Sequence, residues 1–269
     1  MYDKTKAEQF WTRRVSEVDE LRAVLSYNVP DYINETYSRW ELGLLAKSLD
    51  DISGKSILDM GCGVGRITIE LLRGGANVTA LDNSRKMLEI TEAKAKTASL
   101  EKNLQLVKSS AHEIPLPDET FDIVVCVGLL EHLPLDVRSR ALKELDRVLK
   151  RGGNAYIIVN NENSLFLKRN RSYQMNAQRE DGYFVGIIGL GFIREFFTSL
   201  GAKAEILGSN FFYSYFRHTL DQLGEVERLD LISKEMMKLT LRIDLEGESW
   251  RSVDLENRLA DQFLVRVSK

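Results

Sequence analysis

Apolar side chains recur at helical spacing in the first part of the chain and in short runs between helical patterns in the rest. Over residues 1–49 they return every three or four positions, which predicts helices. The clearest series is Val15, Val18, Leu21 and Leu25. The pattern breaks at Pro30 and resumes from Tyr32 to Leu49. We therefore expect a helical N-terminal cap over residues 1–50, outside the sheet that follows.

Beyond residue 50, short apolar runs alternate with amphipathic runs. The predicted strands cover Ser56–Met60, Asn77–Leu81, Leu104–Val107, Phe121–Val127 and Ala155–Val159. The helices predicted between them cover Val64–Arg73, Ser84–Ala98 and Leu135–Leu149. Such alternation with apolar strands specifies a parallel sheet with helices on both faces. Ligands then bind beyond the carboxyl ends of the strands.

The last part of the chain is less regular. It predicts a helix over Phe192–Leu200, a strand over Ala204–Leu207, a helix around Glu225–Met237 and a final antiparallel strand over Phe263–Val267. We expect lid insertions at about residues 160–190 and 209–258. Together these elements predict an α/β fold over residues 51–269, with a doubly wound, mostly parallel, Rossmann-like sheet of seven strands.

The organising turn of the chain is the stretch Ile57-Leu58-Asp59-Met60-Gly61-Cys62-Gly63-Val64-Gly65-Arg66, which predicts a strand, a tight loop and a helix. Glycine permits positive φ and close approach of a ligand, and the helix start directs unpaired N–H groups at the loop. In a dinucleotide-binding G-x-G-x-x-G sequence the third glycine would fall at Arg66. Asp59 would repel a phosphate but would pair with an ammonium group. The ligand should therefore carry a cation.

Asp82 closes the second predicted strand. A carboxylate about twenty residues after the glycine loop accepts hydrogen bonds from ribose hydroxyls. The alternative role, an acidic cap on the next helix, is filled by Ser84. The sequence therefore predicts a nucleoside at this edge of the sheet.

With these motifs the chain resembles the class I S-adenosylmethionine-dependent methyltransferases, nearest to the small-molecule enzymes of ubiquinone and menaquinone biosynthesis. The resemblance is close from Lys55 to Val159 and weaker to about Leu207. The stretch Pro115-Leu116-Pro117-Asp118-Glu119-Thr120-Phe121-Asp122 also resembles the family's approach to the fourth strand. The resemblance implies S-adenosylmethionine as cofactor, S-adenosylhomocysteine as its product, and the class I methyltransferase fold.

The resemblance also implies a set of cofactor-binding residues. Asp59, Gly61 and Gly63 would contact the amino and carboxylate groups, Asp82 the ribose, and Arg39 the carboxylate as a bidentate clamp. The full set is Arg39, Asp59, Gly61, Cys62, Gly63, Gly65, Asp82, Asn83, Met87, Ser110, Ala111, Val127 and Gly128. Many relatives carry Asp where Ser110 stands here, so the contact to the adenine amino group departs from the family's pattern. A solvated Arg39 and a core-facing Met87 remain alternatives.

The resemblance leaves the catalytic residues less defined. Tyr37 could face the methyl group, and His132 could act as a base; for both, a purely structural role is the alternative. His112 is expected at the adenine edge or in solvent. Asn160 and Asn161 follow the fifth strand and could orient a substrate or form a polar turn. Two further features, the basic run at residues 168–171 and the aromatic block at residues 211–218, could belong to a substrate site or to an ordinary surface and core.

Composition narrows the partners. The chain has 269 residues, a formal net charge of −3 and two cysteines. This balance gives no electrostatic attraction to nucleic acid, and two cysteines suggest neither disulfides nor a metal cluster. The polar N-terminus and short apolar runs predict no signal peptide and no membrane segment. We expect a cytoplasmic monomer or homodimer that acts on a small molecule.

Several alternatives stay open. A nucleic-acid or protein methyltransferase shares the same core fold, although the former would favour a basic surface. A non-catalytic S-adenosylmethionine-binding protein is compatible with the same motifs, because a fold does not fix a function. The substrate, and whether O-, N- or C-methylation occurs, are not defined by the sequence.

Overall fold

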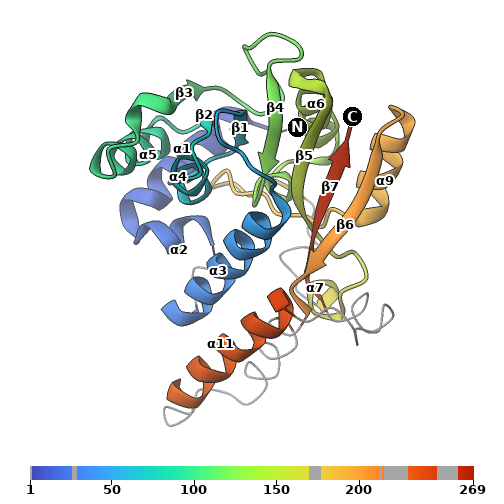
Figure 1. Ribbon diagram of the computed structural model, residues 1–269. Helices are drawn as coiled ribbons and strands as arrows, with labels where there is room; N and C mark the ends of the chain where they lie inside the picture. Colours follow the sequence, from blue (N-terminus) through green and yellow to red (C-terminus); the bar gives the residue numbers. More distant parts are fainter. Residues whose placement is uncertain (1, 26–28, 170–176, 212–213, 215–229, 247–259) are drawn as a thin grey trace.

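In the part of the chain that the computed structural model describes, seven strands form one sheet (Figure 1). They are β1 (Ser56–Met60), β2 (Asn77–Asp82), β3 (Leu104–Lys108), β4 (Phe121–Cys126), β5 (Leu149–Asn160), β6 (Lys203–Ser209) and β7 (Gln262–Ser268). Their order across the sheet is β3-β2-β1-β4-β5-β7-β6, and β7 runs antiparallel to both neighbours. The predicted α/β fold with a doubly wound, mostly parallel sheet is confirmed.

The structure describes residues 2–25, 29–169, 177–211, 214, 230–246 and 260–269. Some expectations lie outside these residues. They are most of the aromatic block at 211–218, the start of the helix predicted from Glu225, and the end of the basic run at 168–171.

Helices flank the sheet and precede it. They are α1 (Lys4–Glu17), α2 (Glu20–Val24), α3 (Asp31–Ser48), α4 (Arg66–Arg73), α5 (Arg85–Thr97), η1 (Glu101–Asn103), η2 (Leu130–His132), α6 (Leu135–Val148), α7 (Leu165–Arg169), α9 (Leu190–Ser199) and α11 (Asp230–Glu246). The first three occupy the predicted N-terminal cap, and α11 packs along α3 (Figure 1).

The core lies on both faces of the sheet because side chains alternate along each strand. Leu58 and Met60 of β1 belong to the apolar cluster that includes Leu142 of α6 and Phe197 of α9. Ile57 belongs to the opposite cluster, with helices α3 and α4. Helices on both faces make the strands apolar on both sides, which is why they read as near-continuous apolar runs.

Among the boundaries that differ from the sequence-based prediction, those of α4 and β5 have a structural cause at a glycine. Helix α4 begins at Arg66 rather than Val64, because Gly65 adopts a left-handed conformation with φ 77° and caps the helix. Strand β5 begins at Leu149 rather than Ala155, so Gly152 lies within it. Its pairing with β4 is irregular near Phe121, and the positive φ of Gly152, 75°, accommodates the bend.

No helix in the described ranges is both long enough and apolar enough to cross a bilayer.

Gly65 and Gly152 form a matched pair for a stability test. Both have positive φ, but a Cβ on Gly65 would lie 2.7 Å from Thr91 Oγ1, whereas a Cβ on Gly152 would meet nothing within 4 Å. We expect Gly152→Ala to cost about 1–2 kcal/mol through backbone strain. Gly65→Ala should cost about 1–3 kcal/mol more, because crowding of α4 against α5 is added. Urea unfolding measures both, and equal losses would contradict the predicted contact.

Candidate active site

A cavity lies at the carboxyl ends of β1, β2, β3 and β4, where the predicted site residues were expected to meet. The ends of these strands and the loops after them supply residues 59 and 61–64, 81–83, 109–112, and 127–129 with 132 and 133. Tyr2, Trp11 and Val24 of the N-terminal segment complete the wall. The sequence therefore folds so that four loops and a helical cover enclose one space.

Asp82 holds the loops after β1 and β2 together. Its Oδ2 accepts a hydrogen bond from the Gly63 backbone N–H at 2.9 Å, and its Oδ1 accepts one from Ser84 N–H at 2.9 Å. Ser84 caps α5, as expected. Burial raises the pKa of Asp82 to about 6, although these backbone donors oppose the rise. A carboxylate has about four lone-pair sites, so two hydroxyl groups could still donate to it.

Asp59 is the most buried acid of the cavity, with 2% of its surface exposed. The Thr68 hydroxyl donates to its Oδ2. Burial raises the pKa of Asp59 to about 6, while Thr68 and the nearby Arg66 oppose the rise. A buried carboxylate without a full set of partners favours a cationic ligand beside it.

Arg66 places a positive charge in the same wall. Its Nη1 donates to Ser38 Oγ at 2.8 Å, and its Nη2 donates to Glu41 Oε2 at 2.7 Å. The sequence analysis did not single out this residue. The available signal was its position, since it directly follows the last glycine of the loop and begins α4.

His132 lies at the β4 side of the cavity. Its Nδ1 is 2.9 Å from the Phe184 carbonyl oxygen, which can only accept, so Nδ1 carries the proton and Nε2 has a free lone pair. Burial lowers the pKa of His132 to about 4, and the charges of Arg14 and Arg138 contribute. The ring packs edge-on against Trp11 at 4.8 Å between centroids. His132 is therefore a neutral imidazole in the cavity wall.

His112 lines the opposite side, after β3. It is 8% exposed, and its Nδ1 has no hydrogen-bond partner among the described residues. The Tyr2 ring packs edge-on against it, with 6.3 Å between centroids. Nδ1 of His112 is thus available for a hydrogen bond next to residues 109–112, the loop expected to contact adenine. A polar ring such as adenine could provide that hydrogen bond. Of the two places expected for His112, the buried side chain excludes solvent, and the adenine edge stays a prediction.

The sequence model of the family described as "Methyltransferase domain" matches residues 58–157. A demethylmenaquinone methyltransferase of Lactobacillus johnsonii is 31% identical over 196 residues, which cover 71% of this chain and 69% of that protein. A ubiquinone biosynthesis O-methyltransferase of Aeromonas salmonicida is 34% identical over 110 residues, which cover 41% of this chain and 45% of that protein. This chain belongs to the class I S-adenosylmethionine-dependent methyltransferases.

The fold agrees with that family. The crystal structure of magnesium protoporphyrin IX methyltransferase from Synechocystis with bound S-adenosylhomocysteine has a TM-score of 0.61. The alignment covers 99% of both chains at 15% identity, so it concerns the fold alone. The match to the demethylmenaquinone methyltransferase of Lactococcus lactis covers 59% of that protein, so this chain aligns with only part of the length of that relative.

Eleven of the thirteen predicted cofactor residues lie in the cavity wall, and the exceptions are Gly65 and Arg39. Gly65 faces Thr91 instead, and its role is the close packing of α4 on α5. Arg39 lies on the exposed side of α3, so it cannot clamp a carboxylate in the cavity as expected. Its neighbours Ser38 and Glu41 are one helical turn apart and face Arg66 instead.

Tyr37, predicted to face the methyl group, also lies outside the cavity wall. Its hydroxyl bonds to the Gln262 side chain of β7. Gln262 in turn donates to Asn160 Oδ1 at 3.1 Å. Tyr37 therefore ties α3 to the end of β5, which explains its position without a catalytic role.

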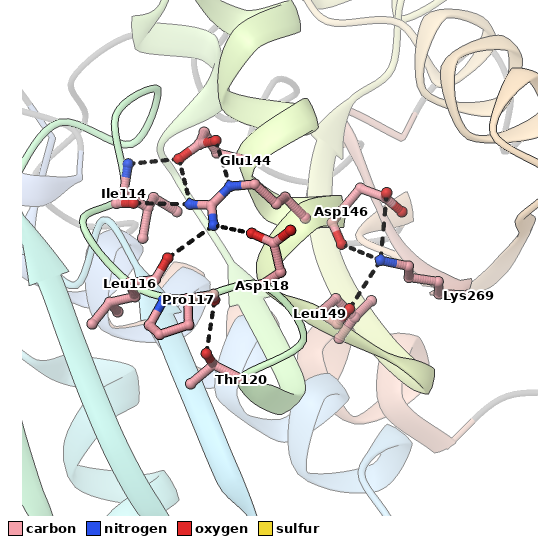
Figure 2. A network of polar contacts seen from close by, with 10 residues as sticks. Ile114, Leu116, Pro117, Asp118, Thr120, Glu144, Asp146, Leu149 and Lys269 are labelled. Carbon is pink, nitrogen blue, oxygen red and sulfur yellow. Dashed lines mark hydrogen bonds and ion pairs between the residues drawn. The ribbon is translucent and has the colours of Figure 1, made fainter.

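The wall after β3 is held in place by Arg147 of α6. Arg147 donates to the carbonyl oxygens of Ile114 and Leu116 and to the carboxylates of Asp118 and Glu144, at distances of 2.7 to 2.9 Å. Figure 2 shows these partners converging between the loop and the helix. Arg147 thus fixes the Pro-x-Pro-Asp stretch of the methyltransferase against α6.

No group of three or more His, Cys, Asp or Glu side chains in the described ranges is arranged to hold a metal ion.

The two buried acids predict a pH dependence of stability. The folded-state pKa of Asp82 is about 6, against an ordinary value of 3.8. Between these values the folded state binds more protons than the unfolded state, so this acid lowers the free energy of unfolding as pH rises. Asp82→Asn should therefore gain stability relative to the parent protein between about pH 4 and pH 7. Urea unfolding across this range checks it, and a constant difference between the two proteins would refute it.

Proposed function

We propose that this protein transfers a methyl group from S-adenosylmethionine to a small molecule. The observation that carries the proposal is the glycine loop flanked by two acids in one cavity, the buried Asp59 and the partly buried Asp82. When bound, the cofactor supplies a methyl group activated by a sulfonium. The chain's own residues bind and orient both reactants and exclude water.

The order of the strands suggests how the residues divide the ligand. Asp82 after β2 would accept hydrogen bonds from the ribose hydroxyls, as acids at this position do. Asp59 after β1 would pair with the amino group, and Gly61 and Gly63 allow the backbone to approach it. The adenine ring would then lie beside β3, between Ser110, Ala111 and Met87. This would place the methyl group on the β4 side, near Val127 and Gly128. Asn83 and Cys62 complete the wall around the nucleoside.

A small-molecule acceptor is supported by the net charge of −3 and by the names of the relatives, which act in quinone biosynthesis. The two cysteines, Cys62 and Cys126, are both buried and free, which suits a reducing cytoplasm. We propose a cytoplasmic enzyme, monomeric or homodimeric, that requires neither nucleic acid nor membrane as partner.

His132 is the proposed base. The Phe184 carbonyl fixes the proton on Nδ1, so Nε2 is the atom that can accept a proton inside the cavity. An acceptor whose nucleophilic atom carries a proton would transfer that proton to Nε2. The nucleophilic atom would bond to the methyl carbon as the methyl–sulfur bond breaks, with S-adenosylhomocysteine as the leaving group. The low pKa of His132 keeps the imidazole neutral at neutral pH, so the lone pair of Nε2 is not protonated.

Replacement of Asp82 tests the cofactor site. Asp82→Ala should weaken S-adenosylhomocysteine binding by about tenfold or more, because charged hydrogen bonds of about 1.5–3 kcal/mol are lost and 1.4 kcal/mol is tenfold. Asp51→Ala is the control, since Asp51 is exposed and precedes β1 at the opposite edge of the sheet. Calorimetry compares the two, and an unchanged affinity in Asp82→Ala would refute the ribose assignment.

Methyl transfer itself can be tested with labelled cofactor and a metabolite extract. Label should appear in a small molecule, and no labelled product from a protein that binds the cofactor would favour a non-catalytic role. With the acceptor so found, His132→Asn should lower kcat by about 10²- to 10⁴-fold, because asparagine can replace Nδ1 but not Nε2. Affinity for S-adenosylhomocysteine should stay within about threefold. A normal kcat would exclude His132 as base.

A further inference from the structure

We propose that Arg66 recognises the α-carboxylate at the amino-acid end of the cofactor, and that Glu41 and Ser38 of α3 are the residues that position it. The inference rests on the proposed function, since it assigns one more contact of the same ligand. It replaces Arg39 with a residue of α4 as the source of the positive charge.

The first support is the place of Arg66 in the cavity. Among the cavity-lining residues in the described ranges, it is the only lysine or arginine. Its side chain is 14% exposed, so the charge is enclosed by the protein and little weakened by water. It begins α4 directly after the glycine loop, beside the end of β1. A ligand that reaches Asp59 therefore also reaches the guanidinium.

The second support is the number of donors that Arg66 keeps free. A guanidinium has five N–H groups in a planar fork, and two hydrogen bonds to α3 are recorded, to Ser38 and Glu41. None of the Arg66 nitrogens is both buried and without a hydrogen-bond partner, so the N–H groups that do not bond to α3 are accessible. These donors can pair with a carboxylate, whose two oxygens match the planar fork of the guanidinium.

The third support is the pairing of opposite charges. The amino-acid end of the cofactor carries an ammonium and a carboxylate on one carbon. The wall offers a carboxylate, Asp59, and a guanidinium cation, Arg66. The two are close enough that the charge of Arg66 lowers the pKa of Asp59, in opposition to the effect of burial. One wall therefore presents the two charges that a zwitterion requires.

Glu41 explains why the guanidinium stays in place. It is 2% exposed, and Arg66 is its ion-pair partner at 2.7 Å. Burial raises the pKa of Glu41, and the Arg66 charge opposes this rise. Glu41 does not line the cavity, so its effect on a ligand must pass through Arg66. It is a positioning residue.

The test compares two ligands that differ only at the amino-acid end. S-Adenosylhomocysteine carries the carboxylate, whereas 5′-methylthioadenosine shares the nucleoside and sulfur but lacks it. In Arg66→Gln the affinity for S-adenosylhomocysteine should fall by about tenfold or more, and that for 5′-methylthioadenosine by less than about twofold. Arg66→Lys should lose less, because charge remains without the fork. Calorimetry gives the ratio of the two dissociation constants.

Two further variants separate positioning from packing. Glu41→Gln should reduce S-adenosylhomocysteine affinity in the same selective way but by a smaller factor, since Arg66 keeps its charge and loses its fixed position. Arg39→Gln, the exposed neighbour on α3, should change neither affinity.

Equal losses for both ligands in folded Arg66→Gln, checked by circular dichroism, would show that Arg66 only shapes the cavity and would overturn the inference. An unchanged affinity for S-adenosylhomocysteine would overturn it as well. Failure of the parent protein to bind either nucleoside is a distinct result, because it would refute the proposed function and this inference with it.

Discussion

The site depends on two carboxylates that lie near the carboxyl ends of adjacent strands, largely out of water. Asp59 is the last but one residue of β1 and is buried, and Asp82 ends the neighbouring β2 and is partly buried. Removing a carboxylate from water costs several kcal/mol unless hydrogen bonds and charges replace the solvent. The protein's own donors replace the solvent only in part, since burial raises the pKa values of both acids to about 6. A cationic, hydroxyl-bearing ligand would therefore stabilise the charged form of both carboxylates.

The glycine loop keeps these acids where they are. The Gly63 N–H donates to Asp82, while the Gly63 carbonyl accepts from Thr91 Oγ1 at 3.0 Å and the Val64 carbonyl accepts from Lys94 Nζ at 2.8 Å. Two side chains of helix α5 therefore hold the backbone of the loop by hydrogen bonds. Positive φ at three glycines lets the backbone meet all these partners within a few residues, which side chains with a Cβ would oppose.

Sequence patterns located the sheet and most of the cavity because both follow from strand order. Apolar runs marked the strands, and the parallel sheet brought their carboxyl ends together. The failure at Arg39 has a physical cause in α3, which buries polar and apolar side chains alike, among them Ser38, Trp40 and Glu41. Charged side chains point outward at Asp31, Glu35 and Arg39, but polar and charged side chains also occupy the buried face, so polarity alone does not separate the two faces and the rotation of the helix is set by packing.

Tyr2 and Trp11 were missed for a different reason, since they reach the cavity only through contacts distant in sequence. Asp3 N–H donates to the Gln178 side chain at 2.8 Å, across 175 residues. A few residues later the same segment presents the Phe184 carbonyl to His132. One stretch of chain thus fastens the N-terminal cover and fixes the tautomer of the proposed base. Enclosure of the cavity and orientation of His132 are therefore not independent, because both rely on that stretch staying packed against α1.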